Sequence, residues 1–293
     1  MAEPLVAEPK RRSLQCASPK GLHRIAYLEW GDARNRDVLV CVHGLTRTSR
    51  DFDYLATELC PQFRVVCPDL AGRGDSDRLA EPRLYAVPQY VSDMVTLIAR
   101  LDVEAVHWVG TSLGGLVGMA LAAQSGSPVK RLVLNDCGPV ISKASLERIA
   151  AYVGLTPVFA NPEAAEQYVR AITVPFGEHS AAQWRFLTET WIRQGTDGSW
   201  RPHYDPSISE AFRATLSDKD LELWPLYDAI RCPTLLLRGE HSDLLSRETA
   251  AEMARRGPKA RVAEIRGVGH APTLLHADQI AIVRDFLLEG VGP

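Results

Sequence analysis

The sequence predicts an α/β protein with a mostly parallel, twisted sheet flanked by helices and with an inserted helical segment. Short β-branched runs alternate with longer helical patterns in the first half of the chain, and the alternation resumes near its end. Such alternation implies parallel strands joined by crossover helices, which cover both faces of the sheet. Between these two parts, residues 139–226 lack buried strand runs and read as helices punctuated by prolines and glycines. The chain has 293 residues and 46% apolar content, enough to bury a large core.

The individual elements are expected in the following order. Residues 1–18, with acids and prolines at the start, are expected to form a flexible leader outside the fold. Leu22–Trp30 alternates like a strand of an exposed sheet. Further strands are expected at 38–42, 64–67, 106–109, 132–134, 234–237 and 261–265, and helices at 51–59, 89–101, 113–124, 247–254 and 277–288.

Composition argues against several classes of partner. The 33 Lys and Arg residues against 36 Asp and Glu give a net charge of −3, which offers no broad basic surface for nucleic acid or an anionic membrane. No apolar stretch approaches the roughly 20 residues of a transmembrane helix, and the N-terminus lacks the apolar core of a signal peptide. The six cysteines are scattered without a CxxC pair, which disfavours disulfides and metal ligation. We therefore expect a cytoplasmic protein without a bound metal.

The motif with the most chemical content is Gly110-Thr111-Ser112-Leu113-Gly114. It lies between a predicted strand and a predicted helix, the context in which a G-x-S-x-G pattern marks a nucleophilic serine. On such a turn the Ser112 backbone is strained and its hydroxyl projects above the sheet, while Gly110 and Gly114 leave room for neighbouring elements. The N-terminus of the following helix supplies N–H groups and a positive dipole end for a developing oxyanion.

A nucleophilic serine needs a general base and an acid that orients the base. His270 lies in a glycine-rich turn between the last strand and the last helix, and His43 is a competitor at the end of another strand. Asp243, in the loop after the strand 234–237, is the natural acid. Asp136, which follows the strand ending at Leu134, is a second candidate.

Together these motifs resemble those of the α/β-hydrolases, over about residues 20–137 and 227–290. The family's chain order of nucleophile, acid and base is matched by Ser112, Asp243 and His270. His43-Gly44 after one strand and the segment Asp69–Ser76 are further matching marks. The resemblance implies a core formed by residues 19–138 and 227–293, with residues 139–226 as a helical cap or lid over the pocket.

The resemblance also implies how the loops around the serine work. The His43-Gly44 segment is expected to shape the oxyanion loop, with His43 in a structural role rather than as the base. The backbone N–H groups of Leu45 and Leu113 are the expected oxyanion donors.

The implied activity is that of a serine carboxylesterase, which forms an acyl-enzyme and uses no metal or organic cofactor. The expected substrate is a small to medium, largely apolar ester. Dehalogenases and epoxide hydrolases are disfavoured because they use an aspartate where this chain has Ser112. Lactonase or enol-lactonase chemistry needs the same groups and stays open. C–C bond hydrolases of ring-cleavage pathways use the same triad and stay an alternative, but they are less favoured because they usually place a tryptophan after the base, where this chain has Ala271.

Two further predictions concern the pocket and the partners. Large side chains of the inserted segment are candidates to line an apolar cavity, although each is individually more typical of packing: Trp184, Trp191, Trp200, Trp224, Phe159, Phe176, Phe186 and Phe212. Arg47 and Arg50 are candidates to meet a substrate carboxylate, although loop arginines are more often solvated. A non-catalytic binding protein of this fold is disfavoured because all three expected triad members are present. A homo-oligomer is compatible with the sequence.

Overall fold

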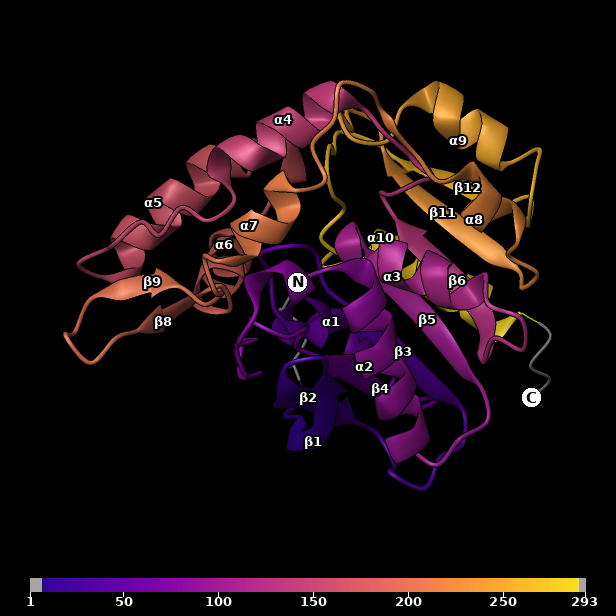
Figure 1. Ribbon diagram of the computed structural model, residues 1–293, viewed down its shortest axis with the longest axis horizontal. Helices are drawn as coiled ribbons and strands as arrows, with labels where there is room; N and C mark the ends of the chain where they lie inside the picture. Colours follow the sequence, from indigo (N-terminus) through magenta and orange to yellow (C-terminus); the bar gives the residue numbers. More distant parts are fainter. Residues whose placement is uncertain (1–6, 290–293) are drawn as a thin grey trace.

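The computed structural model describes residues 7–289, which form an eight-stranded sheet flanked by helices (Figure 1). The strand order is β1-β2-β4-β3-β5-β6-β11-β12. These strands are β1 (Lys10–Ser18), β2 (Gly21–Trp30), β3 (Val38–Val42), β4 (Arg64–Pro68), β5 (Val106–Thr111), β6 (Val129–Asn135), β11 (Thr234–Gly239) and β12 (Arg261–Ile265). Strand β2 is antiparallel to β1 and β4, and the pairs from β4 to β12 are parallel. The predicted α/β class with a mostly parallel sheet is therefore confirmed.

Helices cover both faces of the sheet, which explains why its central strands are apolar without alternation. The flanking elements are η1 (Ser49–Phe52), α1 (Asp53–Leu59), η2 (Pro82–Leu84), α2 (Val87–Arg100), α3 (Leu113–Ala122), α9 (Arg247–Met253) and α10 (Ala277–Leu288). In β3, Val38, Val40 and Val42 pack into one core cluster with side chains of α2 and α3. Leu39 and Cys41 point the other way and pack with side chains of α1 and α10. Successive residues of a strand face opposite sides, so a strand buried on both faces needs an unbroken apolar run.

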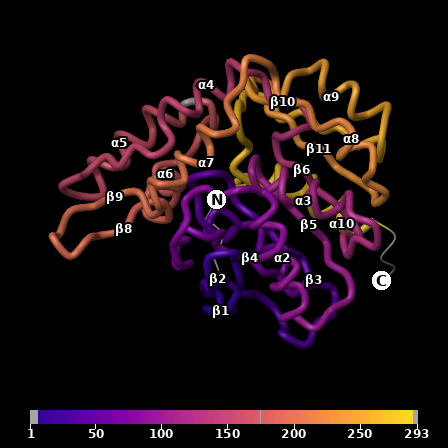
Figure 2. The backbone as a smooth tube through the Cα atoms, in the orientation of Figure 1, coloured from indigo at the N-terminus to yellow at the C-terminus, as the bar shows by residue number. Residues whose placement is uncertain are grey.

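A long excursion, residues 139–226, separates β6 from β11 and is called the insert below. Its elements are β7 (Val140–Ile141), α4 (Lys143–Tyr152), α5 (Pro162–Ile172), η3 (Val174–Phe176), α6 (Ala181–Glu189), β8 (Ile192–Gln194), β9 (Trp200–Pro202), α7 (Ile208–Arg213) and β10 (Leu221–Glu222), with α8 (Trp224–Asp228) leading back to the sheet. Figure 1 shows α4, α5, α7 and the β8–β9 hairpin gathered to one side of the sheet. Figure 2 traces the chain from β6 through the insert and back to β11.

Local capping signals set the beginnings of the insert's helices. Ser142 caps α4 by accepting a hydrogen bond from the backbone of Ser145, and Asn161 caps α5 in the same way with Pro162 at the first turn. Ser180 and Gln183 form a reciprocal capping box at the start of α6. Each cap satisfies N–H groups that have no partner within the helix. The insert also contains two short antiparallel pairs, β7–β10 and β8–β9, which the expectation of helices alone had missed.

The expected flexible leader at residues 1–18 is wrong for its second half. Residues 10–18 form β1, which pairs with β2 over its full length from Lys10 opposite Glu29 to Ser18 opposite Gly21. Leu14 and Cys16 are buried while their neighbours are exposed. Only two apolar side chains face inward among charged and polar ones, so the period-2 pattern is weak in the sequence. Residues 1–6 lie outside the described residues.

Replacing Leu14 tests whether β1 belongs to the folded core. Leu14→Ala is expected to lower the free energy of unfolding by about 2 kcal/mol or more, because a 7% exposed leucine loses its packing. The exposed neighbour Gln15 provides a matched control, and Gln15→Ala is expected to change it by less than about 0.5 kcal/mol. Urea denaturation measures both. Equal, near-zero effects would mean that this segment is a leader after all.

Candidate active site

Ser112 lies on a sharp turn between β5 and α3. Its backbone has a φ of 51° and a ψ of −113°, a region that side-chain-bearing residues rarely adopt. Such a conformation costs on the order of 1–3 kcal/mol and persists only where the surroundings enforce it. Here the Ser112 N–H donates to the Asn135 carbonyl (3.0 Å), which fixes the turn against the end of β6. The strained serine predicted from the motif is confirmed.

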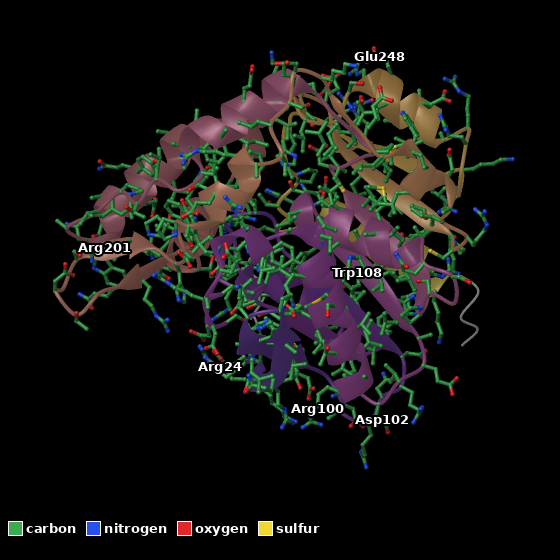
Figure 3. All side chains as sticks on the ribbon, viewed as in Figure 1. Arg24, Arg100, Asp102, Trp108, Arg201 and Glu248 are labelled. Atoms are coloured by element: carbon green, nitrogen blue, oxygen red, sulfur yellow. The ribbon has the colours of Figure 1, made fainter. Side chains whose placement is uncertain are left out.

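The glycines around Ser112 are required by close backbone approaches. A Cβ on Gly114 would lie 1.9 Å from the carbonyl oxygen of Val42, and one on Gly110 would lie 2.3 Å from that of Gly114. No side chain fits at either position, so α3 packs directly on the ends of β3 and β5. The Trp108 indole, labelled in Figure 3, donates to the Gly114 carbonyl (3.1 Å) and supports the same turn from below.

Gly44 differs from these two glycines because it has space for a side chain. A Cβ there would meet the Ser112 Cβ at 3.8 Å, an ordinary contact distance. Gly44 and Ser112 both line the cavity, so a longer side chain at position 44 would take up space beside the serine. Its lack of a side chain keeps the approach to Ser112 open.

His270 links Ser112 to a buried carboxylate. Its Nε2 lies 3.1 Å from Ser112 Oγ, and its Nδ1 lies 2.7 Å from Oδ2 of Asp136. Because an ionised carboxylate only accepts hydrogen bonds, the Nδ1–H donates to Asp136 and Nε2 is left to accept from the serine hydroxyl. The loop after β12 thus carries His270 to the end of β5, as the sequence predicts.

The predicted pairing of His270 with Asp243 is wrong, and the second candidate, Asp136, takes that place. Asp136 is fully buried and follows β6, the strand next to β5 in the sheet. Its φ of 54° turns the chain sharply at the strand end. The Asp243 side chain is half exposed and forms an ion pair with Arg148 of α4 (3.0 Å). Both aspartates follow strands, so the choice depends on the directions in which the two loops turn.

Two residues of the β11 loop complete the environment of Asp136. The Gly239 N–H donates to Oδ1 (2.8 Å), and the Ser242 hydroxyl donates to Oδ2 (2.6 Å). With His270, these donors compensate for the water that a buried carboxylate loses. Ser242 was not among the predicted site residues. Ser242 immediately precedes Asp243, so the β11 loop reaches the site through the Ser242 hydroxyl, whereas the carboxylate that pairs with His270 comes from the β6 loop.

His43 is buried and acts as a structural link. Its Nε2 accepts from the Leu70 N–H (3.0 Å), so its Nδ1 carries the proton and donates to the Gly44 carbonyl (2.7 Å). Burial lowers the pKa of His43 to about 3, which keeps the ring neutral. Since a trans peptide places N–H opposite C=O, the anchored Gly44 carbonyl also fixes the direction of the Leu45 N–H.

The segment Asp69–Ser76 holds the other side of the same loop. The buried Arg73 donates from Nε to the Leu45 carbonyl (2.9 Å) and from Nη1 to the Tyr90 hydroxyl (2.6 Å). Asp69 accepts from the backbone N–H groups of Ser49 and Asp75, and burial raises its pKa to about 6. Arg73 was not singled out from the sequence, because nothing in a glycine-flanked arginine indicates that it folds inward.

A cavity of about 710 Å³ opens above Ser112, within the range of ligand sites. Its wall combines core loops with the insert and is mostly apolar. Of the predicted aromatic residues, Phe176, Trp191 and Phe212 line it. The other five are not part of the wall as residues 7–289 form it, and this wall also contains tyrosines that were not predicted: Tyr85, Tyr90, Tyr152, Tyr168 and Tyr204. Leu45 and Leu113, the predicted oxyanion donors, lie in the wall with Ser112.

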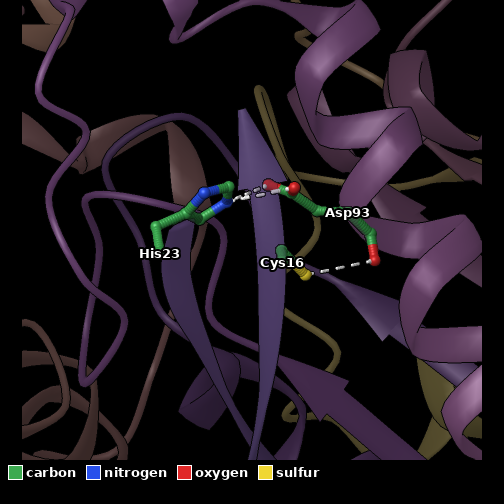
Figure 4. Close-up of side chains that lie close together, drawn as sticks. All are labelled: Cys16, His23 and Asp93. Atoms are coloured by element: carbon green, nitrogen blue, oxygen red, sulfur yellow. Dashed lines mark hydrogen bonds and ion pairs between the residues drawn. The ribbon is translucent and has the colours of Figure 1, made fainter. Parts of the chain in front are cut away.

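A second buried polar cluster lies away from this cavity (Figure 4). His23 Nε2 contacts both carboxylate oxygens of Asp93 at 3.1 Å, and the Gln89 amide donates to the same carboxylate (2.8 Å). The Cys16 thiol points to the Asp93 backbone carbonyl (3.9 Å), and burial raises the pKa of that thiol to about 12. These contacts join β1 and β2 to α2.

Within residues 7–289, none of the helices combines the length and the apolar character that crossing a membrane requires.

Comparisons with known proteins place these observations in context. The profile described as "Alpha/beta hydrolase family" matches residues 39–283. The chain is 52% identical to the 3-hydroxybutyrate-oligomer hydrolase of Cupriavidus necator, over 96% of this chain and 98% of that protein. It is 30% identical to a pimeloyl-[acyl-carrier protein] methyl ester esterase of Xanthomonas campestris, over 83% and 91% of the two chains. A crystal structure of an alpha/beta hydrolase from Novosphingobium aromaticivorans superposes with a TM-score of 0.86 at 38% identity, covering 96% and 98%.

Replacing each of the two aspartates by asparagine distinguishes their roles. Asp136→Asn is expected to lower kcat for a neutral ester such as p-nitrophenyl butyrate by about 10⁴-fold, because the His270 tautomer is no longer enforced. Asp243→Asn is expected to lower it by less than about tenfold, since that carboxylate lies outside the His270 hydrogen bond. Steady-state kinetics of both variants measure the difference. A larger loss in Asp243→Asn would contradict the geometry.

His43 makes folding stability depend on pH in a defined direction. The unfolded chain binds a proton at His43 below about pH 6.5, whereas the folded chain does so only near pH 3, so this residue reduces stability as the pH falls between these values. In His43→Asn this contribution is absent. The stability advantage of the wild type over the variant is therefore expected to shrink on acidification, by at most about 1.4 kcal/mol per pH unit. Urea denaturation between neutral pH and about pH 4 measures it, and a constant difference would refute it.

Proposed function

The chain belongs to the alpha/beta hydrolase family and is an enzyme that hydrolyses carboxylic esters, and on this premise we propose that Ser112, His270 and Asp136 form its catalytic triad. The proposal rests on one observation, the continuous line of contacts from Ser112 Oγ through both ring nitrogens of His270 to Asp136. This order of donors and acceptors is what nucleophilic catalysis by serine requires.

The reaction proceeds in two acyl-transfer steps. As Ser112 Oγ attacks the ester carbonyl carbon, His270 Nε2 takes the hydroxyl proton, and Asp136 stabilises the imidazolium that forms. The tetrahedral intermediate collapses, the C–O bond of the ester breaks, and the leaving alkoxide takes the proton from His270. Water then attacks the acyl-enzyme with His270 again as the base, which releases the acid and restores Ser112.

The oxyanion of each tetrahedral intermediate is stabilised by the backbone N–H groups of Leu45 and Leu113. Leu113 is the first residue of α3, where N–H groups have no intrahelical partner and the helix dipole is positive. Leu45 is held from both sides, through the Gly44 carbonyl by His43 and through its own carbonyl by Arg73. Each such donor contributes about 3 kcal/mol in the transition state.

The substrates that fit best are short oligomers of 3-hydroxybutyrate. The relative from C. necator that is 52% identical over nearly the whole chain carries this activity in its name. A largely apolar cavity of about 710 Å³ has room for several methyl-bearing ester units. The insert acts as the cap, because α4 to α7 contribute the wall opposite Ser112. A cytoplasmic location is supported by six cysteines that are free in the described chain.

Covalent labelling tests the nucleophile. A serine-directed fluorophosphonate is expected to stop hydrolysis of p-nitrophenyl butyrate. It is also expected to attach one phosphonyl group to the peptide that contains Ser112, with loss of fluoride, which mass spectrometry detects. Ser112→Ala is expected to abolish both labelling and turnover. The wild type, but not this variant, is expected to release monomer from the 3-hydroxybutyrate dimer and trimer. Labelling of another residue, or turnover by Ser112→Ala, would refute the proposal. Turnover of a lactone in preference to both oligomers would favour the lactonase alternative.

A further inference from the structure

The charged side chains of the cavity wall form two ion pairs of different character. Apart from His270, the charged residues in the described part of the wall are Arg47, Asp51, Arg148 and Asp243. Arg47 pairs with Asp51, and Arg148 pairs with Asp243. An anionic substrate that enters this otherwise apolar cavity has these two arginines as candidate partners.

The donors of Arg47 are already in use. Its Nε and Nη2 donate to Asp51 at 2.9 and 2.6 Å, and its Nη1 donates to the Leu187 carbonyl at 3.3 Å. The pair is largely buried, with 13% and 18% of the two side chains exposed. Removing Asp51 from this arginine would leave a carboxylate desolvated without a partner, which is costly. Arg47 therefore reads as a fixed part of the wall.

Arg148 is different because its partner is exchangeable. A single contact of 3.0 Å joins its Nη2 to Asp243, and 45% and 50% of the two side chains are exposed. Ion pairs of this exposure contribute about 1 kcal/mol or less, and Asp243 stays hydrated when the contact breaks. The guanidinium has five N–H donors in a planar fork suited to a carboxylate. Apart from the contact with Asp243, these donors have no partner among residues 7–289 and can meet a ligand.

The surroundings of Arg148 supply a second donor and connect it to the reaction centre. Tyr152 lies one turn further along α4, on the same face, and also lines the cavity. Tyr152 keeps 42% of its surface exposed, and its contact with the protein raises the pKa of its hydroxyl, a change that Arg148 opposes and Asp243 adds to, so the three groups lie within electrostatic reach. Asp243 directly follows Ser242, whose hydroxyl donates to Asp136. The pair therefore lines the same cavity as Ser112 and His270, and Asp243 is one residue along the chain from a side chain that contacts Asp136.

We propose that Arg148, assisted by the Tyr152 hydroxyl, is the subsite for a free carboxylate at one end of the ester substrate, and that Asp243 is the internal counter-ion which this carboxylate displaces. The inference rests on the proposed function and narrows its substrate class to esters of hydroxy acids that keep an ionised end. Oligomers of 3-hydroxybutyrate have such an end, and binding it next to the triad selects cleavage near that terminus.

Paired substrates and matched variants test the subsite. The substrates are the 3-hydroxybutyrate dimer as its free acid and the same dimer with a carboxamide in place of the carboxylate. Arg148→Met is expected to lower the ratio of kcat/KM for acid over amide by about tenfold to a hundredfold, through KM, because charge-assisted hydrogen bonds are lost. Arg148→Lys is expected to recover part of the ratio, and Asp243→Asn to raise it above the wild type. Arg185→Met, an exposed arginine of α6 outside the described cavity wall, is expected to leave it unchanged.

The outcomes separate the two proposals. Hydrolysis of both dimers with an acid-to-amide ratio that Arg148→Met leaves intact would overturn the subsite and leave the triad standing. Hydrolysis of neither dimer by the wild type would overturn the proposed function together with the subsite. As a readout without turnover, calorimetric titration of the acid dimer into Ser112→Ala is expected to show binding that the additional Arg148→Met change weakens by a similar factor. Equal affinity in the two proteins would contradict the subsite.

Discussion

The site depends on one buried carboxylate. Asp136 has no exposed surface, yet its oxygens accept from the Gly239 backbone, the Ser242 hydroxyl and His270. An ionised carboxylate in such a place is stable only if several donors replace its water, so these contacts constrain three loops at once. The loops follow β6, β11 and β12, neighbours in the sheet. The carboxylate therefore fixes the position of the His270 ring, and the ring in turn places its Nε2 within hydrogen-bond distance of Ser112 Oγ.

The second constraint is the close packing of backbone around Ser112. Because Gly110 and Gly114 have no side chains, α3 begins directly against β3 and β5, and the serine must adopt its strained conformation. The same compactness brings the Leu45 loop beside Ser112, where His43 contacts the Gly44 carbonyl and Arg73 contacts the Leu45 carbonyl. Rigid groups aimed at the reacting carbonyl need little reorganisation during the reaction, which is how preorganised sites stabilise an oxyanion. The insert then completes the cavity with mostly apolar walls.

Features set by contiguous residues could be predicted from the sequence, whereas features set by contacts between distant segments could not. The parallel strands and Ser112 follow from contiguous patterns, an apolar run or a glycine-flanked serine between strand and helix. The partner of His270 was predicted wrongly because Asp136 and Asp243 both follow buried strands, and the directions in which the two loops turn decide which one reaches His270. Strand β1 was missed because two inward side chains, Leu14 and Cys16, gave too short an alternation. The inward folding of Arg73 has no local signal at all.

Asp136 accepts a hydrogen bond from the Nδ1–H of His270, and proton NMR observes that proton directly. A histidine N–H bonded to a buried carboxylate is shielded from solvent exchange and gives a far-downfield resonance. We expect this resonance in the wild type and in Asp243→Asn, and its loss or a large upfield shift in Asp136→Asn. A resonance that survives unchanged in Asp136→Asn and disappears in Asp243→Asn would contradict the account.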